Sequence, residues 1–232
     1  TGSVRTQLQL AVAFWTSRGF TVADVDYRGS TGYGRSYRHR LRGGWGVLDV
    51  DDCVAVARYL SSDERPPTEQ VDAERLAIRG GSAGGFTVLA ALTFHDVFSA
   101  GASRYGIGDL AALAADTHKF EARYLDRLVG RWPEDEAVYR ERSPIHHVDR
   151  LATPLLLLQG SEDRVVPPAQ AHAMADALRE QGVPFELIEF PDEGHGFRKA
   201  ANVVRALEAE LAFFADRFGF EVPERTGRQD RT

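Results

Sequence analysis

Cysteine is nearly absent from this sequence. Cys53 is the only one, so no disulfide can form within the chain, and we do not expect the protein to depend on an oxidising compartment. The cytoplasm is therefore the expected location. No run of apolar residues approaches the ~20 that a membrane span requires, which argues against a membrane partner.

Positive charge is not in excess either. The 28 Lys and Arg stand against 34 Asp and Glu, which leaves a net charge of −6 at pH 7. This balance argues against nucleic acid and against an anionic membrane surface as partners. With 43% hydrophobic and 27% charged residues, the composition is that of a globular protein, and 232 residues can bury one sizeable core.

The chain alternates between strand-like apolar runs and runs with helical periodicity. This alternation favours an α/β fold, with a mostly parallel sheet and helices on both faces. Residues 109–150 are irregular and charged, and we expect a cap-like excursion or a substrate wall there. Residues 223–232 form a polar tail. Strands are expected at 20–25, 76–78, 98–103, 155–158 and 185–190, and helices at 8–15, 50–60, 86–94, 171–178 and 204–218.

The motif Gly-x-Ser-x-Gly occurs at residues 80–84, between an expected strand and an expected helix. In that context the serine lies on a sharp turn at the carboxyl end of a sheet, as the nucleophile of a hydrolase does. Ser82 is the candidate nucleophile, and glycines on both sides let the backbone take the turn. The amide of Ala83, at the start of the helix, is a candidate oxyanion donor. The alternative is a glycine-rich turn with an incidental serine.

An acidic residue follows the next buried strand. Asp163 lies in the loop after the leucine run 155–158, where a carboxylate can orient an imidazole. On its own, Asp163 is more typical of a residue that caps the helix starting near Pro167, and Glu162 is a rival for the catalytic role.

A histidine between two glycines completes the set. His195 follows the expected strand 185–190, and an isolated loop histidine would usually be just a solvated one. The chain order Ser82, Asp163, His195 is that of the α/β-hydrolase fold, so together the three residues predict a Ser-His-Asp hydrolase. We expect no cofactor. His146 and His147 could suggest a metal, but no further ligand stands at a convincing spacing, so no metal site is predicted.

Four stretches resemble the catalytic domain of the prolyl oligopeptidase family of serine peptidases, nearest its acylaminoacyl-peptidase and dipeptidyl-peptidase-like branch. They lie at residues 26–34, 79–85, 159–167 and 193–197. The resemblance implies an α/β-hydrolase fold and an enzyme that acts on short peptides, releasing acyl-amino acids or dipeptides or cleaving oligopeptides. It assigns catalysis to Ser82, Asp163 and His195 and leaves a homo-oligomer open. A carboxylesterase of the same fold and a non-catalytic scaffold are the alternatives.

The chain departs from the family at its substrate pocket. Relatives often carry an Arg or Asn two residues after the triad Asp, whereas this chain has Val165 there and Arg164 one place earlier. The substrate contact made at that position is therefore open here. Tyr105, Phe120 and Tyr124 are further candidates for the pocket, although aromatic residues at such spacings are more often part of a core.

The family also implies segments that this sequence lacks. Relatives open with a β-propeller and the first hydrolase strands, and then supply a second oxyanion donor from a His-Gly-Gly-Pro-type segment. We therefore expect residues 1–222 to be an amino-terminally incomplete hydrolase domain of a longer protein. In this fold the third strand lies between the strands expected at 20–25 and 76–78, so its absence would leave a slot in the middle of the sheet.

Overall fold

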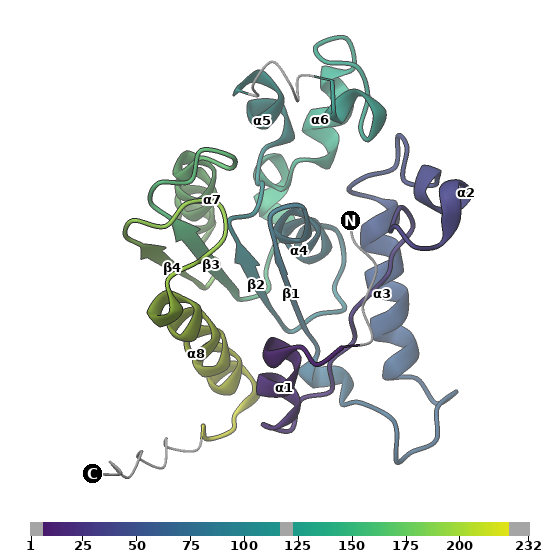
Figure 1. Cartoon of the computed structure of the whole chain (residues 1–232), viewed down its shortest axis with the longest axis vertical. Coiled ribbons are helices and arrows are strands. Elements are labelled where there is room, and N and C mark those ends of the chain that lie inside the picture. Colours follow the sequence, from purple (N-terminus) through teal and green to yellow (C-terminus); the bar gives the residue numbers. More distant parts are fainter. Residues whose placement is uncertain (1–6, 117–122, 223–232) are drawn as a thin grey trace.

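The described part of the chain holds a sheet of four parallel strands. The computed structural model describes residues 7–116 and 123–222, so the expected polar tail lies outside the described part. The strands are β1 (Ala77–Gly81), β2 (Ala100–Arg104), β3 (Leu155–Gly160) and β4 (Phe185–Phe190), in the spatial order β1-β2-β3-β4 (Figure 1). All three pairings are parallel, so the carboxyl ends of the strands meet at one edge of the sheet.

Helices cover both faces of the sheet, as the sequence predicted. One face packs against α3 (Leu48–Leu60), α4 (Ala83–Phe94) and α7 (Pro168–Gln181), and the other against α1 (Leu10–Thr16) and α8 (Ala200–Phe218). The remaining helices are α2 (Gly34–His39), α5 (Leu110–Asp116), α6 (Glu136–Arg142) and the short 3-10 helices η1 (Ala73–Arg75), η2 (Leu125–Arg127) and η3 (Pro144–Arg150). Within 7–116 and 123–222, no helix combines the length and apolarity needed to cross a membrane.

The leucine run of β3 explains why the sheet is covered on both sides. Leu155 and Leu157 belong to the core on the α4 and α7 side, while Leu156 and Leu158 belong to the core on the α8 side. All four leucines are at most 3% exposed. Successive side chains of a strand point to opposite faces, so a continuous apolar run is stable only between two helical layers.

The strand expected at residues 20–25 is not present. Among the described residues this extended segment forms no strand, because no other strand lies beside it to complete a ladder. Instead, a groove of about 940 Å³ separates it from β1 and is lined by Phe20, Val25, Ile78 and Val88 among others. β1 is consequently an edge strand within the described part of the chain.

A buried carboxylate joins α8 to two strands of the sheet. Glu210 of α8 is fully buried and accepts hydrogen bonds from the guanidinium groups of Arg79, in β1, and Arg104, at the end of β2. The two arginines lie only 18–34% exposed, so their charges are partly removed from water. A buried charge persists only when it is paired, so these three residues stabilise each other.

We predict that Glu210→Gln destabilises the fold. The substitution leaves two guanidinium groups facing a neutral amide, and loss of one partner of a buried ion pair typically costs about 3–5 kcal/mol. The expected result is a fall of several degrees in the melting temperature of the natural-length protein, measured by differential scanning fluorimetry. Glu180→Gln, at an exposed carboxylate of α7, is the matched control and should leave the melting temperature nearly unchanged. Equal melting temperatures for the two variants would contradict the prediction.

Candidate active site

Ser82 occupies a strained turn between β1 and α4. It is the N-cap residue of α4, with φ 56° and ψ −119°, a region that residues other than glycine rarely enter. Its amide donates to the carbonyl of Arg104 (2.9 Å), and its carbonyl accepts from the amide of Phe86 (3.0 Å). The turn is thus held from β2 on one side and from α4 on the other, and it presents the side chain at the carboxyl edge of the sheet.

The glycine before the turn avoids a Cβ clash, as expected, whereas a Cβ at Gly84 would meet nothing within 4 Å. The strained φ falls on Ser82, whereas Gly80 and Gly85 have no positive φ. A Cβ at Gly80 would lie 2.4 Å from the carbonyl oxygen of Gly84, and one at Gly85 would lie 2.7 Å from the Cα of Gly106. Only glycine therefore lets β1, the start of α4 and the loop after β2 approach so closely.

The structure brings Ser82, His195 and Asp163 into one chain of hydrogen-bond contacts. The Nε2 atom of His195 lies 2.8 Å from the Oγ of Ser82, and its Nδ1 lies 2.8 Å from Oδ2 of Asp163. The carboxylate of Asp163 is fully buried and the imidazole is 24% exposed. Each residue follows a different strand, namely β1, β3 and β4, so the parallel topology is what unites them.

The two carboxylate oxygens of Asp163 have different partners. Its Oδ1 accepts hydrogen bonds from the amides of Val165 (2.8 Å) and Val166 (2.9 Å), which closes the turn that leads into α7. Its Oδ2 lies beside the imidazole. The side chain does not cap α7, whose N-cap is Pro167 with no side-chain hydrogen bond, so the capping interpretation is wrong, while the catalytic role stays a prediction. Glu162, the rival, is exposed, and among the described residues the carboxylate that pairs with His195 is that of Asp163.

The loop that carries His195 is anchored by a residue that the sequence analysis had not singled out. Glu193 is 2% exposed and accepts hydrogen bonds from the amides of Arg198 and Lys199 and from the side chain of Asn202, at the start of α8. These donors, led by the Arg198 amide, lower the pKa of the Glu193 carboxyl. The only sequence signal was its place two residues before the histidine.

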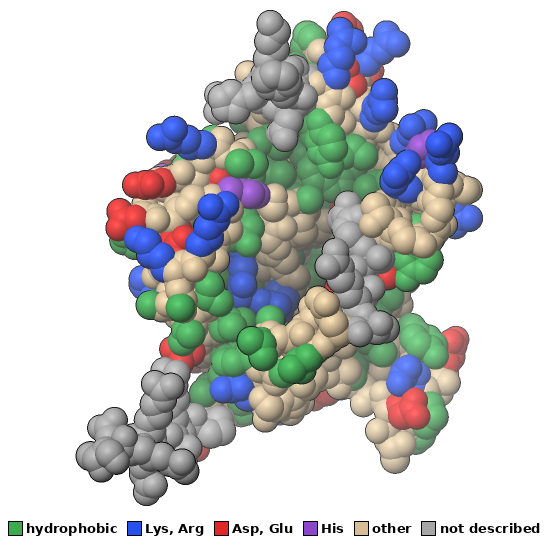
Figure 2. Space-filling view, in the orientation of Figure 1, with side chains coloured by type: hydrophobic (Ala, Val, Ile, Leu, Met, Phe, Trp, Pro, Cys, Tyr) green, Lys and Arg blue, Asp and Glu red, His purple; other side chains and the backbone are tan. Residues whose placement is uncertain are grey.

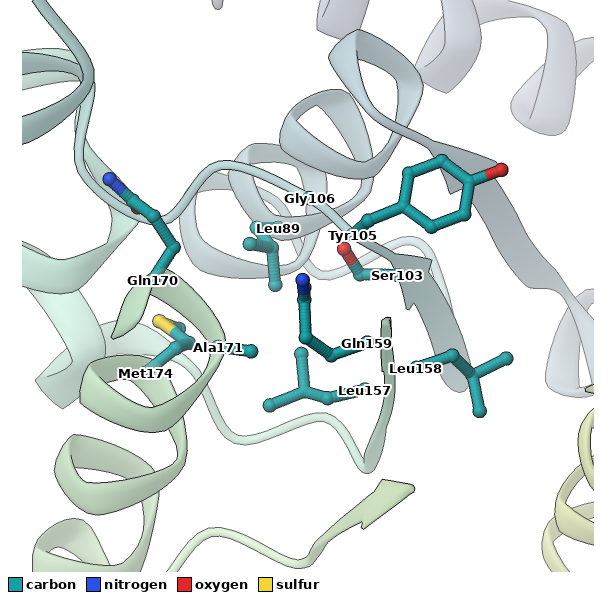
Figure 3. Close-up of a pocket in the computed structure, with 10 residues that line it drawn as sticks. All are labelled: Leu89, Ser103, Tyr105, Gly106, Leu157, Leu158, Gln159, Gln170, Ala171 and Met174. Atoms are coloured by element: carbon teal, nitrogen blue, oxygen red, sulfur yellow. The ribbon is translucent and has the colours of Figure 1, made fainter. Parts of the chain in front are cut away.

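Tyr105 contacts the imidazole directly. Its ring centroid lies 4.9 Å from that of His195 and 5.4 Å from that of Phe197, both edge to face. Burial raises the pKa of its phenol, and its backbone has a positive φ of 38°. Figure 3 shows the ring pointing away from a small cavity that Gly106 and Gln159 help to line. The cavity measures only about 10 Å³, which is too small for any part of a peptide.

The other proposed pocket residues are dispersed or outside the described part. The side chains of Arg164 and Val165 are exposed beside Asp163. Tyr124 is 61% exposed and lines a different pocket, and Phe120 lies outside the described residues. Their roles in binding stay predictions.

The surroundings of Ser82 suit attack on a carbonyl group. Ala83 is the first residue of α4, where backbone N–H groups have no acceptor within the helix and the helix dipole favours negative charge. The one thiol is not a competing nucleophile, because burial raises the pKa of Cys53 to about 12 and keeps it protonated. Among the described residues, no three His, Cys, Asp or Glu side chains are grouped as metal ligands would be.

Comparison with known proteins identifies the family of this chain. Residues 6–221 match the model of the prolyl oligopeptidase family. A solved structure of a puromycin-hydrolysing peptidase from Mycobacterium tuberculosis is 53% identical, with a TM-score of 0.90 over 95% of this chain and 33% of that one.

Two curated relatives match over a similar part of the chain. Dipeptidyl aminopeptidase BIII of Pseudoxanthomonas mexicana is 32% identical over 80% of this chain and 27% of its own length. Acylamino-acid-releasing enzyme 1 of Oryza sativa subsp. japonica is 30% identical over 82% of this chain and 25% of its own length. The chain thus spans about a quarter of the curated relatives it matches. Since the family model covers nearly all of the sequence, the chain belongs to the prolyl oligopeptidase family of serine peptidases.

Proposed function

We propose that this chain is the catalytic part of a serine peptidase that uses Ser82, His195 and Asp163 as its triad. The single observation that supports it most is the pair of 2.8 Å contacts that join the three side chains. In this mechanism His195 accepts the Ser82 proton at Nε2 while Oγ attacks the carbonyl carbon of the substrate. Asp163 fixes the tautomer through Nδ1–H and stabilises the imidazolium that forms.

The tetrahedral intermediate then collapses to an acyl-enzyme. The amide of Ala83 donates a hydrogen bond to the oxyanion, where one such donor is typically worth about 3–4 kcal/mol. His195 returns its proton to the leaving amine, which departs as the carbon–nitrogen bond breaks. Water, activated by the same imidazole, attacks the acyl-enzyme and releases the acid together with the free Ser82 hydroxyl.

The substrates we propose are short peptides, cleaved to release an acyl-amino acid or a dipeptide. Support comes from the relatives, which include a dipeptidyl aminopeptidase and an acylamino-acid-releasing enzyme. The more similar solved structure is of a puromycin-hydrolysing peptidase, so puromycin belongs among the compounds tested.

We further propose that the groove beside β1 is filled in the natural-length protein. Its occupant would be a β-strand from upstream hydrolase residues, which a β-propeller would precede. The support is the groove itself, about 940 Å³ between the extended segment 20–25 and β1. Strands that pair on both edges lie about 4.8 Å from each neighbour, and an inserted strand would satisfy the free edge of β1.

The triad assignment predicts graded losses of activity. Ser82→Ala should abolish labelling of the natural-length protein by a fluorophosphonate probe, because the probe captures the nucleophilic hydroxyl. Asp163→Asn should leave labelling slow and lower kcat by about 10⁴-fold, since the wrong tautomer faces Ser82. Glu162→Gln is the matched control and should retain activity. Undiminished labelling of the Ser82→Ala protein would refute the assignment.

The peptidase and carboxylesterase alternatives separate on amide substrates. We expect the natural-length protein to hydrolyse acyl-peptide and dipeptide anilides, and the same assay should include puromycin and a p-nitrophenyl ester. Ester turnover alone does not decide, because the same triad and oxyanion donor serve both reactions. Ester hydrolysis without any amide turnover would defeat the peptidase proposal in favour of an esterase.

The groove predicts a difference between the 232-residue chain alone and the natural-length protein. By itself the chain should bind the apolar dye ANS, aggregate and turn over no substrate, because an unfilled groove leaves apolar side chains and strand amides in water. The natural-length protein should show weak dye binding and full turnover. Cooperative two-state unfolding together with turnover by the isolated chain would contradict the proposed occupant.

A further inference from the structure

Arginines gather around an open pocket at the carboxyl-edge end of the molecule. The pocket measures about 550 Å³ and lies between α2 with its following loop and the segment around η2. Figure 2 shows the corresponding group of blue side chains, with one purple, over α2. We call it the basic pocket; its lining residues are Arg38, His39, Arg42, Arg123, Tyr124, Asp126, Arg127 and Leu128.

The charges of the basic pocket are not neutralised by described neighbours. Arg38, Arg42, Arg123 and Arg127 are all exposed, and no described carboxylate lies within ion-pair distance of any of them. Asp126 is the one acidic residue that lines the pocket in the described part of the chain. Four guanidinium groups against one carboxylate create a positive surface on a protein whose net charge is −6.

His39 lies in the same positive surroundings. Its Nε2 lies 3.1 Å from Nη2 of Arg42 and accepts from that guanidinium when the imidazole is neutral. Burial first, and then the charges of Arg42 and Arg38, lower the pKa of His39. Only the part of this shift that comes from the arginine charges would be relieved by a negative ligand.

The basic pocket is held in place by backbone contacts. The amide of Gly43 donates to the carbonyl of Arg127 (3.0 Å), and the amide of Trp45 donates to that of Leu128 (3.1 Å). These two bonds fix the loop after α2 against the η2 segment, so arginines from distant parts of the sequence face a common space.

The same loop packs against the helix that carries the nucleophile. The ring of Trp45 lies 4.7 Å from that of Phe86, centroid to centroid, and Phe86 is in the first turn of α4, with its amide bonded to the carbonyl of Ser82. Trp45, Phe86 and partly buried Ala83 belong to one apolar cluster, together with Leu41 and Leu125 from the two sides of the basic pocket. One apolar cluster therefore lies between the loop that lines the basic pocket and the turn of Ser82.

We propose that the basic pocket binds a carboxylate of the peptide substrate while Ser82 attacks the scissile bond. This inference rests on the proposed peptidase function and adds a preference to it. The carboxylate could be the C-terminal one or that of an Asp or Glu side chain, and both present two oxygens to the planar guanidinium fork. Exposed arginines around an open pocket also steer an anionic substrate toward that pocket.

A peptide suits the observations better than a large acidic partner. The basic pocket is concave and its volume matches a few residues of chain, whereas a protein surface would need a wide, matching face. The negative net charge would also repel an acidic protein or nucleic acid outside this small area, while a short peptide meets only the local field.

The test compares peptides that differ in one charge. The natural-length protein is assayed for kcat/KM with a peptide ending in a free carboxylate, with its C-terminal amide, and with an amide carrying Glu at the last position. We expect the free acid or the Glu peptide to exceed the neutral amide by about three- to tenfold at low salt, with the advantage shrinking as salt is raised. Whichever peptide gains identifies the source of the carboxylate.

Substitutions then test whether the preference for a carboxylate depends on the basic pocket. In Arg42→Gln/Arg127→Gln the acid-to-amide ratio should fall to near one, while Arg58→Gln, an exposed arginine of α3 outside the pocket, should keep the wild-type ratio. Melting temperatures verify that both proteins fold. A ratio unchanged in the double variant overturns the proposal, and so does a wild-type ratio of one, which would leave an acidic protein surface as the better ligand.

A binding measurement separates this proposal from the proposed function. Dissociation constants of the three peptides for the Ser82→Ala natural-length protein are measured by fluorescence anisotropy. Peptide hydrolysis with no charge preference in either assay rejects the basic pocket as a carboxylate site and leaves the peptidase function standing. A charge preference in binding that the Arg42→Gln/Arg127→Gln substitutions remove, without hydrolysis of any peptide, supports the pocket and rejects the peptidase.

Discussion

The strained backbone of Ser82 is the constraint on which the rest of this site depends. A residue with a Cβ in that conformation persists only when its neighbours hold it from several sides. Here the Arg104 carbonyl holds the Ser82 amide, and Glu210 holds the guanidinium groups of Arg104 and Arg79. The last helix of the domain thereby supports the turn between β1 and α4, although it contributes no reacting group. Tyr105, next in sequence to Arg104, extends the same support to the imidazole.

The sequence was a good guide to the elements that bring Ser82, Asp163 and His195 together. Strand-to-helix turns and glycine-flanked loops leave local signals, and the leucine run of β3 marks a strand that is buried on both faces. Glu210 could not have been found in this way, because it lies 131 residues from Arg79 and sits in a helix with an ordinary amphipathic pattern. The wrongly predicted strand at 20–25 has the right residues but no neighbour to pair with, which no local pattern records.

The arginines are distributed unevenly over the structure, which the net charge does not reveal. Acidic residues exceed basic ones over the chain, yet four arginines share one small pocket, and two more are turned inward to meet Glu210. Arg79 and Arg104 are positioned by their ion pairs with buried Glu210. The arginines of the basic pocket are positioned by backbone hydrogen bonds between the loop after α2 and the η2 segment. Composition could predict neither arrangement, since it averages over residues that the fold separates.

The spatial order of the strands has a consequence for synthesis of the protein on the ribosome. In the described part of the chain, each strand after β1 pairs with the strand made just before it, so the sheet can grow stepwise as the chain emerges. His195 comes from the loop after the final strand and Glu210 from the helix that follows it. A nascent chain therefore carries Ser82 long before His195 emerges, so the contact between the two side chains can form only after the loop beyond β4 has been made.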